Sequence, residues 1–232
     1  MKIFVIIPAL NEAGNIRRLV GEVLATMPVE VIVVDNGSDD GTGEEARAAG
    51  VRVVREPRRG YGYACAAGIA AAQDAEILVF LDGDHSFLPA EIPTLVAPIL
   101  AGKSDLVLGS RERGWISPGA MPFHQRLGNR LVSWLMSRFY GVEITDLGPY
   151  RAVRRSLLRR LDMREMTFGW PTEMIVKAAR GGARITEVPV SYRSRAAGRS
   201  KVSGSLRGAF LAAWFILGVT LRYAWKQTPS ER

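Results

Sequence analysis

Two carboxylates separated by one glycine, Asp82 and Asp84, are the residues of this chain best suited to chemistry. They follow an apolar run, residues 77–81, that fits a buried parallel strand. Because like charges repel, such a pair needs compensation, and a divalent cation that also bridges substrate phosphates is the usual solution. An ordinary turn explains the pair equally well at this stage, since Asp and Gly are common where strands end.

A third acid, Asp35, favours a ligand site over a plain turn. It ends a second apolar run, residues 30–35, and the apolar runs 3–7, 30–35, 51–54 and 77–81 alternate with helical segments. This alternation is typical of a mostly parallel sheet that is covered by helices on both faces. Because the carboxyl ends of such strands share the edge where open α/β sheets bind ligands, we expect Asp35, Asp82 and Asp84 to converge there.

The second half of the chain predicts further elements. We expect a helix over 88–101 with proline breaks, a strand over 105–111 that ends in Arg111, a last strand over 184–192 and a cationic segment over 193–201. Residues 112–123, with Trp115, are expected to form a mobile flap. Residues 124–140 predict a basic amphipathic helix, whose apolar side either covers the sheet or lies on a membrane surface.

The C-terminal segment contains fourteen uncharged residues, 208–221. A membrane span needs about 20 apolar residues, so a complete crossing is not expected. An interfacial helix or an oligomer contact suits the segment better, and docking on the domain's own core is the alternative.

Composition limits the classes of protein. With 232 residues, 47 % hydrophobic and 23 % charged, the chain is expected to be one folded α/β domain with an appendage. The net charge of +8 suits phosphate-bearing ligands, nucleic acid or an anionic membrane. A single cysteine, Cys65, excludes an intrachain disulfide framework. No signal peptide, P-loop, EF-hand loop or Cys/His cluster is predicted, and no nucleic-acid motif, so a nucleic-acid-binding module is a remote alternative.

Five motifs resemble a known family. Ile-Ile-Pro-Ala-Leu-Asn-Glu at 6–12, Val-Val-Asp-Asn-Gly-Ser-Asp-Asp-Gly-Thr at 33–42 and Asp-Gly-Asp at 82–84 resemble the family 2 glycosyltransferases of GT-A fold. Residues 145–151 and 198–204 are similar to the dolichol- and polyprenol-phosphate mannosyl- and glucosyltransferase branch. The resemblance implies a GT-A domain over 1–204, with a nucleotide-sugar part over 1–110 and an acceptor part over 111–204. An apolar or amphipathic C-terminal helix over 205–232 is expected to follow.

The resemblance also implies roles for individual residues. Asp82, Asp84 and Ser86 would hold Mg²⁺ or Mn²⁺, with Asp84 the better direct ligand. The catalytic candidates are Asp84, Arg111 and Asp146. The residues expected to contact the donor or the acceptor are Pro8, Leu10, Glu12, Val33, Asp35, Asp82, Gly83, Arg111, Arg151, Arg195 and Lys201.

The function implied is that of an inverting hexosyltransferase. It would move mannose or glucose from a donor such as GDP-mannose or UDP-glucose to a polyprenyl or dolichyl phosphate, while metal and Arg/Lys neutralise the leaving diphosphate. An anionic phosphate acceptor needs no general base, whereas a hydroxyl acceptor needs one, for which Asp146 and then Glu173 are the candidates. We expect a cytoplasmic enzyme on the inner face of the cell membrane, and leave the sugar, the acceptor and any oligomer open.

Overall fold

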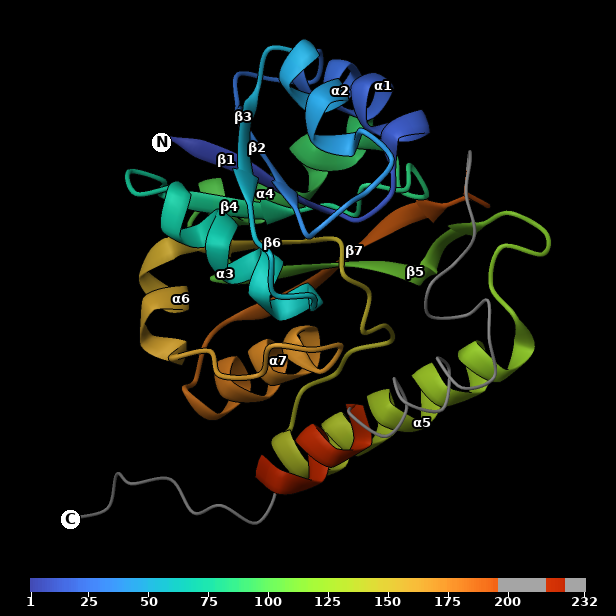
Figure 1. Ribbon diagram of the computed structural model, residues 1–232. Coiled ribbons are helices and arrows are strands. Elements are labelled where there is room, and N and C mark those ends of the chain that lie inside the picture. The colour runs from blue at the N-terminus through green and yellow to red at the C-terminus, as the bar shows by residue number, and fades with distance from the viewer. Residues whose placement is uncertain (196–215, 224–232) are drawn as a thin grey trace.

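The apolar runs of the N-terminal half form the centre of a seven-stranded sheet with the order β3-β2-β1-β4-β6-β5-β7. The computed structural model describes residues 1–195 and 216–223 (Figure 1). The predicted contact of Lys201 and the predicted domain boundary at residue 204 lie outside the described residues.

The helices and strands follow one another in βα alternation through the first half of the chain. This half contains β1 (Ile3–Ala9), α1 (Ala13–Leu24), β2 (Glu30–Asp35), α2 (Thr42–Ala48), β3 (Arg52–Arg55), α3 (Tyr61–Ala71) and β4 (Ile77–Phe80). The second half contains η1 (Pro89–Glu91), α4 (Ile92–Leu100), β5 (Leu106–Ile116), α5 (Phe123–Tyr140), β6 (Arg151–Arg154), α6 (Arg155–Leu161), α7 (Trp170–Arg180) and β7 (Ile185–Tyr192).

The prediction of a mostly parallel sheet is confirmed. Strand β1 pairs in parallel with β2 and β4, β2 pairs in parallel with β3, and β5 pairs in parallel with β7. Only β6 among the described strands runs antiparallel, between β4 and β5. The sequence did not predict β6 as a strand, because its four residues carry arginine at both ends and show no strand periodicity. Hydrogen bonding to a neighbour on each side stabilises it.

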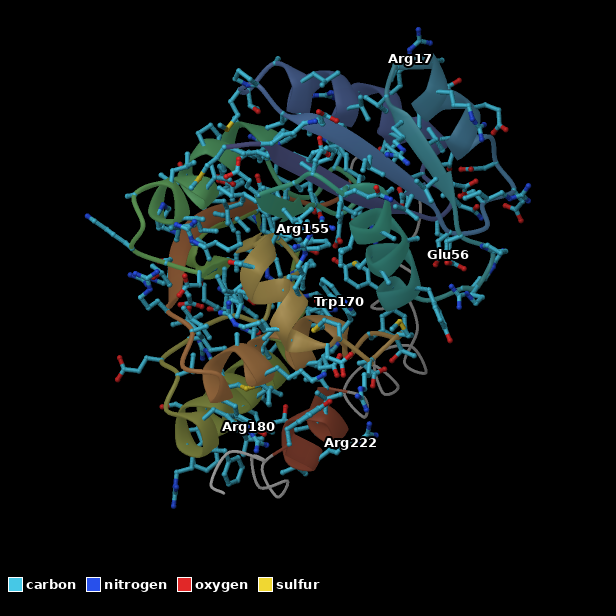
Figure 2. The ribbon with its side chains drawn as sticks, turned by 90° about the vertical axis from the view of Figure 1, so that its left-hand side faces the viewer. Arg17, Glu56, Arg155, Trp170, Arg180 and Arg222 are labelled. Atoms are coloured by element: carbon cyan, nitrogen blue, oxygen red, sulfur yellow. The ribbon has the colours of Figure 1, made fainter. Side chains whose placement is uncertain are left out.

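Helices cover both faces of the sheet, as predicted. Alternation along β1 sends Val5 and Ile7 into a core shared with α1 and α4, whereas Phe4 and Ile6 face a second core shared with α3, α5, α6 and α7. Trp170 at the start of α7 is fully buried in the second core, and its ring lies 4.9 Å from that of Phe80 (Figure 2).

The prediction of a mobile flap over 112–123 is wrong for residues 112–116, which belong to a strand. Strand β5 continues to Ile116, and Trp115 pairs with Ser191 of β7 after a register shift. Gly114 permits this pairing: a Cβ atom there would lie 2.6 Å from the backbone nitrogen of Val190. The sequence suggested a loop because glycine and charged residues interrupt the apolar pattern at this point.

The described part of the C-terminal segment, residues 216–223, is helical and lies against the domain beside α5 (Figure 1). Val219 and Thr220 are buried, and the hydroxyl of Tyr140 donates to the carbonyl of Thr220. The Tyr223 hydroxyl donates to Glu173 of α7 at 2.8 Å. For these residues the structure therefore favours docking on the domain's own core. No helix within the described ranges combines the length and apolar character that a bilayer crossing requires.

Candidate active site

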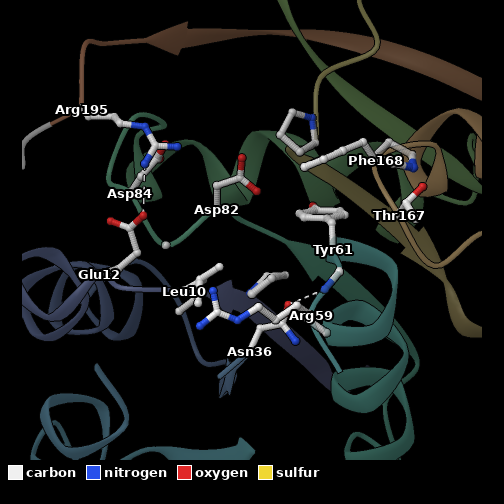
Figure 3. Close-up of a pocket in the computed structure, with 17 residues that line it drawn as sticks. Leu10, Glu12, Asn36, Arg59, Tyr61, Asp82, Asp84, Thr167, Phe168 and Arg195 are labelled. Atoms are coloured by element: carbon white, nitrogen blue, oxygen red, sulfur yellow. Dashed lines mark hydrogen bonds and ion pairs between the residues drawn. The ribbon is translucent and has the colours of Figure 1, made fainter. Parts of the chain in front are cut away.

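A cavity of about 490 Å³ opens at the carboxyl ends of β1, β2 and β4 (Figure 3). This is the edge at which the sequence placed the acidic residues. Of the predicted site residues, Pro8, Leu10, Glu12, Asp82, Gly83, Asp84 and Arg195 line the cavity. The volume lies within the usual range for small-molecule sites, roughly 300–1,000 Å³.

Asp82 lies in the middle of the cavity between its two sides (Figure 3). Its Oδ1 atom is buried and has no hydrogen-bond partner among the described residues. Burial and the neighbouring charge of Asp84 raise the pKa of Asp82 to about 7, against the opposing effect of Arg195 and Arg111. A buried carboxylate oxygen without a partner is costly, so Oδ1 is suited to a cation that is supplied from solution.

Asp84 is held in a fixed orientation. Its Oδ1 atom accepts hydrogen bonds from the Ser86 backbone N–H at 3.0 Å and from the Ser86 hydroxyl at 2.6 Å. Its Oδ2 atom forms an ion pair with Arg195 Nη2 at 2.9 Å. Ser86 therefore orients Asp84, and its predicted contact with a metal stays a prediction.

His85, between Asp84 and Ser86, is directed away from the acids. Its backbone has a φ of 58°, in the left-handed region, and its Nε2 atom lies 2.8 Å from Glu22 Oε2 of α1. The side chain is buried in this pair and does not line the cavity. The structure thus gives His85 a structural position beside the site.

Arg195 joins two acidic residues that are far apart in the sequence. Besides Asp84, it contacts Glu12 Oε1 at 3.1 Å, and the three side chains lie together on one side of the cavity (Figure 3). Glu12 precedes α1, whereas Arg195 follows β7. The predicted cation beside the acidic pair is therefore present in the folded chain.

Two residues predicted to surround the base and ribose do not line the cavity. Val33 is fully buried in the core under α1 and does not reach the cavity, so its predicted contact with the donor stays a prediction. Side chains along β2 point alternately to the two faces of the sheet, and that of Val33 points to the face that α1 covers. Asp35 does reach the expected edge, where its Oδ1 atom accepts from the Ser38 backbone N–H at 2.8 Å, but it stabilises the turn there and is absent from the cavity lining.

Arg111 and Asp146 form a buried pair outside the cavity lining. The Nε and Nη2 atoms of Arg111 each donate to one oxygen of Asp146 at 2.7 Å, and the Arg111 backbone N–H adds a third bond. Burial by itself would raise the pKa of Asp146, but the charge and the hydrogen bonds of Arg111 hold it below its usual value. With both oxygens engaged, Asp146 is poorly placed to take a proton from a substrate.

Arg151 is not placed to contact a substrate. Its side chain is fully buried, and it donates to backbone carbonyls that include Pro171 at 2.8 Å and Pro149 at 3.3 Å. Burial lowers the pKa of Arg151 to about 10. The side chain of Arg151 does not line the cavity, and its predicted contact with the substrate stays a prediction. Arg151 instead positions Pro149 and Pro171, which line the cavity.

The sequence reasoning missed one wall of the cavity, which consists of Tyr61, Thr167 and Phe168 (Figure 3). Asn36 and Arg59 also line the cavity without having been predicted. Two sequence features belong to this wall: a basic, glycine-rich loop before α3 and an aromatic loop before α7. The two loops lie far apart in the sequence. Gly62 brings them together, because a Cβ atom there would lie 2.5 Å from Met166 Cα.

The acidic pair fits a hard divalent cation. No group of three or more His, Cys, Asp or Glu side chains within the described ranges is arranged to hold a metal ion alone. Mg²⁺ is commonly bound by only one or two carboxylates, with water and substrate phosphates completing the shell. Asp82 with its unpartnered oxygen and Asp84 at 5 % exposure supply those two carboxylates.

The sequence is similar to those of known glycosyltransferases. The model of Glycosyl transferase family 2 matches residues 4–162. An uncharacterized glycosyltransferase of Mycobacterium tuberculosis is 39 % identical over 90 % of this chain and 93 % of the relative. An undecaprenyl-phosphate mannosyltransferase of Micrococcus luteus is 33 % identical, with 90 % of each chain covered.

The fold also matches a solved enzyme. Glucosyl-3-phosphoglycerate synthase of Mycobacterium tuberculosis, crystallised with Mn²⁺, UDP and phosphoglyceric acid, superposes with a TM-score of 0.75 at 24 % identity. The match covers 98 % of this chain and 80 % of the synthase. The mostly parallel sheet and its match to the synthase place the fold in the GT-A class. Within that class, the chain belongs to glycosyl transferase family 2 and is a hexosyltransferase.

Proposed function

We propose that the protein is a metal-dependent, inverting glycosyltransferase that moves mannose or glucose from a nucleotide-diphosphate sugar to a polyprenyl phosphate. The observation that carries the proposal is the arrangement of Asp82, Asp84 and Arg195 at one cavity. The relative that is named an undecaprenyl-phosphate mannosyltransferase matches 90 % of this chain and supports the choice of acceptor. With this acceptor, we propose that the enzyme acts at the inner face of the cell membrane.

The cavity offers separate regions for the parts of the donor. Pro8, Leu10 and Asn36 line the cavity at the ends of β1 and β2 and would contact the base and ribose. Asp82 and Asp84 would hold Mg²⁺ or Mn²⁺, which when bound neutralises charge on the leaving diphosphate. The wall that contains Tyr61 and Phe168 bounds the opposite side of the cavity.

Arg195 supplies the second positive charge that the leaving diphosphate needs. Its guanidinium already lies beside Asp84, and its side chain is only partly exposed. A phosphate brought to Asp84 would therefore find a cation within reach. Such preorganised charge stabilises a leaving anion more strongly in a partly buried site than in water.

The state of Asp146 favours a phosphate acceptor over a hydroxyl acceptor. A phosphate monoester is anionic near neutral pH and attacks without losing a proton, whereas a hydroxyl needs a base. Both oxygens of Asp146 are bound by Arg111, and its pKa is lowered. Glu173, the next candidate, is buried between Lys177 and Tyr223 and does not line the cavity.

The test is a direct assay for product. Purified protein, labelled GDP-mannose or UDP-glucose, polyprenyl phosphate and Mg²⁺ should yield a glycolipid, and the absence of product with either donor would overturn the proposal. Asp84→Ala should remove nearly all turnover, while Asp39→Ala, an exposed acid near the same edge, should leave it unchanged. Full activity of the Asp84 variant would refute the metal assignment.

A further inference from the structure

Helix α5 presents two opposite faces, one of which has no partner among the described residues. Its buried face consists of Asn129, Val132, Ser133 and Met136, which pack toward the sheet and α7. On the other side, four large apolar side chains follow one another at helical spacing. This apolar stripe consists of Phe123, Leu127, Leu131 and Trp134, which are 79 %, 59 %, 49 % and 61 % exposed.

The position of α5 leaves the stripe uncovered by the described residues. The helix lies at the periphery of the molecule, with the sheet and α7 on its inner side (Figure 1). Residues 216–223 also contact α5, through the bond from Tyr140 to Thr220, but they lie at the C-terminal end of the helix. Contiguous exposed apolar side chains of this size mark an interaction surface on a soluble domain.

The charges of α5 identify the chemistry of its partner. The helix contains three arginines and no acidic residue. Arg126 contacts Glu112 at 3.4 Å, whereas Arg130 and Arg138 form no ion pair with any described residue. Given 3.6 residues per turn, Arg130 and Arg138 project beside the stripe rather than toward the buried face. Apolar side chains flanked by arginines match the boundary between the acyl chains and anionic headgroups of a bilayer.

The same charges argue against a second copy of the chain. A two-fold dimer that buried one stripe against another would bring the arginines of both helices together. Like charges that face each other across an interface are unfavourable, and no acid on α5 compensates them.

We propose that the apolar stripe of α5 binds the surface of an anionic lipid membrane, with Arg126, Arg130 and Arg138 contacting phosphate headgroups. The helix would lie in the membrane plane and hold the domain at the surface in which a polyprenyl phosphate is embedded. The membrane-binding surface is inferred from the exposed side chains and the charges of α5. Only its link to a polyprenyl phosphate acceptor rests on the proposed function.

Co-sedimentation with lipid vesicles tests the proposal. The full chain should bind vesicles of phosphatidylcholine mixed with phosphatidylglycerol, and binding should weaken in high salt, which screens the arginines. Leu131→Asp should reduce the bound fraction by about tenfold or more, because it places a charge in the apolar stripe. The matched control is Leu100→Asp, since Leu100 is similarly exposed at 44 % but ends α4 on the other face of the sheet.

A second pair of variants tests the charges. Arg138→Gln should weaken binding to anionic vesicles, while Arg159→Gln, an exposed arginine of α6, should not. Nucleotide binding and the thermal midpoint of each variant show that the domain is still folded. Equal binding of the wild type and Leu131→Asp to vesicles would overturn the proposal, as would a dimer in light scattering that Leu131→Asp converts to a monomer.

The activity assay separates this proposal from the proposed function. With the acceptor embedded in vesicles, Leu131→Asp should lose turnover, whereas with a short-chain, detergent-dispersed acceptor it should match the wild type. If no acceptor gives product but vesicle binding still depends on Leu131, the proposed function fails and the membrane surface stands. If vesicle binding is absent while product forms from both acceptors, the membrane surface fails and the function stands.

Discussion

Arg195 Nη2 lies 2.9 Å from Asp84 Oδ2, so a side chain that follows the last strand neutralises the acid that ends the sequence Asp-Gly-Asp. The same guanidinium contacts Glu12, which lies 183 positions earlier in the chain. A cation of the protein thus holds the carboxylate that we assign to the metal. Any metal ion that binds Asp84 through Oδ2 competes with Arg195.

The competition predicts an increase in metal affinity when Arg195 is removed. Partly exposed ion pairs are worth up to about 1 kcal/mol, so Arg195→Gln should tighten Mn²⁺ binding to the nucleotide-free protein by up to about fivefold. It should at the same time weaken binding of the nucleotide diphosphate, which loses a cation. Titration followed by electron paramagnetic resonance measures the first effect, and calorimetry the second. Arg193→Gln, an exposed neighbour, is the control; weaker Mn²⁺ binding in Arg195→Gln would contradict the competition.

The raised pKa of Asp82 predicts a pH-dependent stability. The folded protein keeps a proton on Asp82 up to about pH 7, whereas the unfolded chain loses it near the ordinary value of 3.8. Between these values the folded state binds more protons, so this group lowers the free energy of unfolding as pH rises and has no further effect above about pH 7.

Asp82→Asn removes that titration. In metal-free buffer its stability relative to the wild type should increase from pH 4 to pH 7 and then level off, as measured by urea unfolding across this pH range. The exposed Asp39→Asn serves as the control. A constant difference between Asp82→Asn and the wild type at all pH values would show that Asp82 does not titrate in this interval.

The pair of Arg111 and Asp146 predicts a structural rather than a proton-transfer role for the acid. Asp146→Asn leaves a buried guanidinium without its counter-charge, which should lower the free energy of unfolding by about 3 kcal/mol or more. Turnover per folded molecule with polyprenyl phosphate should be reduced but measurable. Asp105→Asn, which removes a more exposed arginine pair with Arg184, should cost less stability. Complete loss of turnover by a folded Asp146→Asn enzyme would instead support a hydroxyl acceptor.

Because α3 contacts residues 165–166 closely at Gly62, we expect that a larger side chain at this position lowers stability and donor affinity. A Cβ atom there would lie 2.5 Å from Met166 Cα, so Gly62→Ala should displace the loop that carries Thr167 and Phe168. Overpacking of this kind costs about 1–3 kcal/mol, and donor affinity should fall with it. The control is Gly21→Ala in α1, where a Cβ atom meets nothing within 4 Å. That variant should be neutral or slightly stabilising, and equal effects of the two changes would contradict the close contact.

The sequence by itself determined the class of fold and the position of the acids. Short continuous apolar runs are typical of buried strands or buried helix segments, and their length, β-branched content and alternation with helical segments indicated parallel strands. Once β1, β2 and β4 are parallel, chain connectivity places Asp35, Asp82 and Asp84 at one edge. Of the cations expected at the diphosphate, Arg195 lines the cavity, Arg111 pairs with Asp146 outside its lining, and Lys201 lies outside the described residues.

Only the tertiary structure decided which side chains meet. Arg111 pairs with Asp146 across 35 positions, Arg151 is buried, and Val33 faces the core, although their sequence motifs gave all of them substrate or catalytic roles. Tyr61 and Phe168 form one wall because Gly62 allows two distant loops to touch. The presence of most strands follows from local apolar patterns, whereas strand order, side-chain direction and loop packing depend on contacts between residues far apart in the chain, which no local pattern encodes.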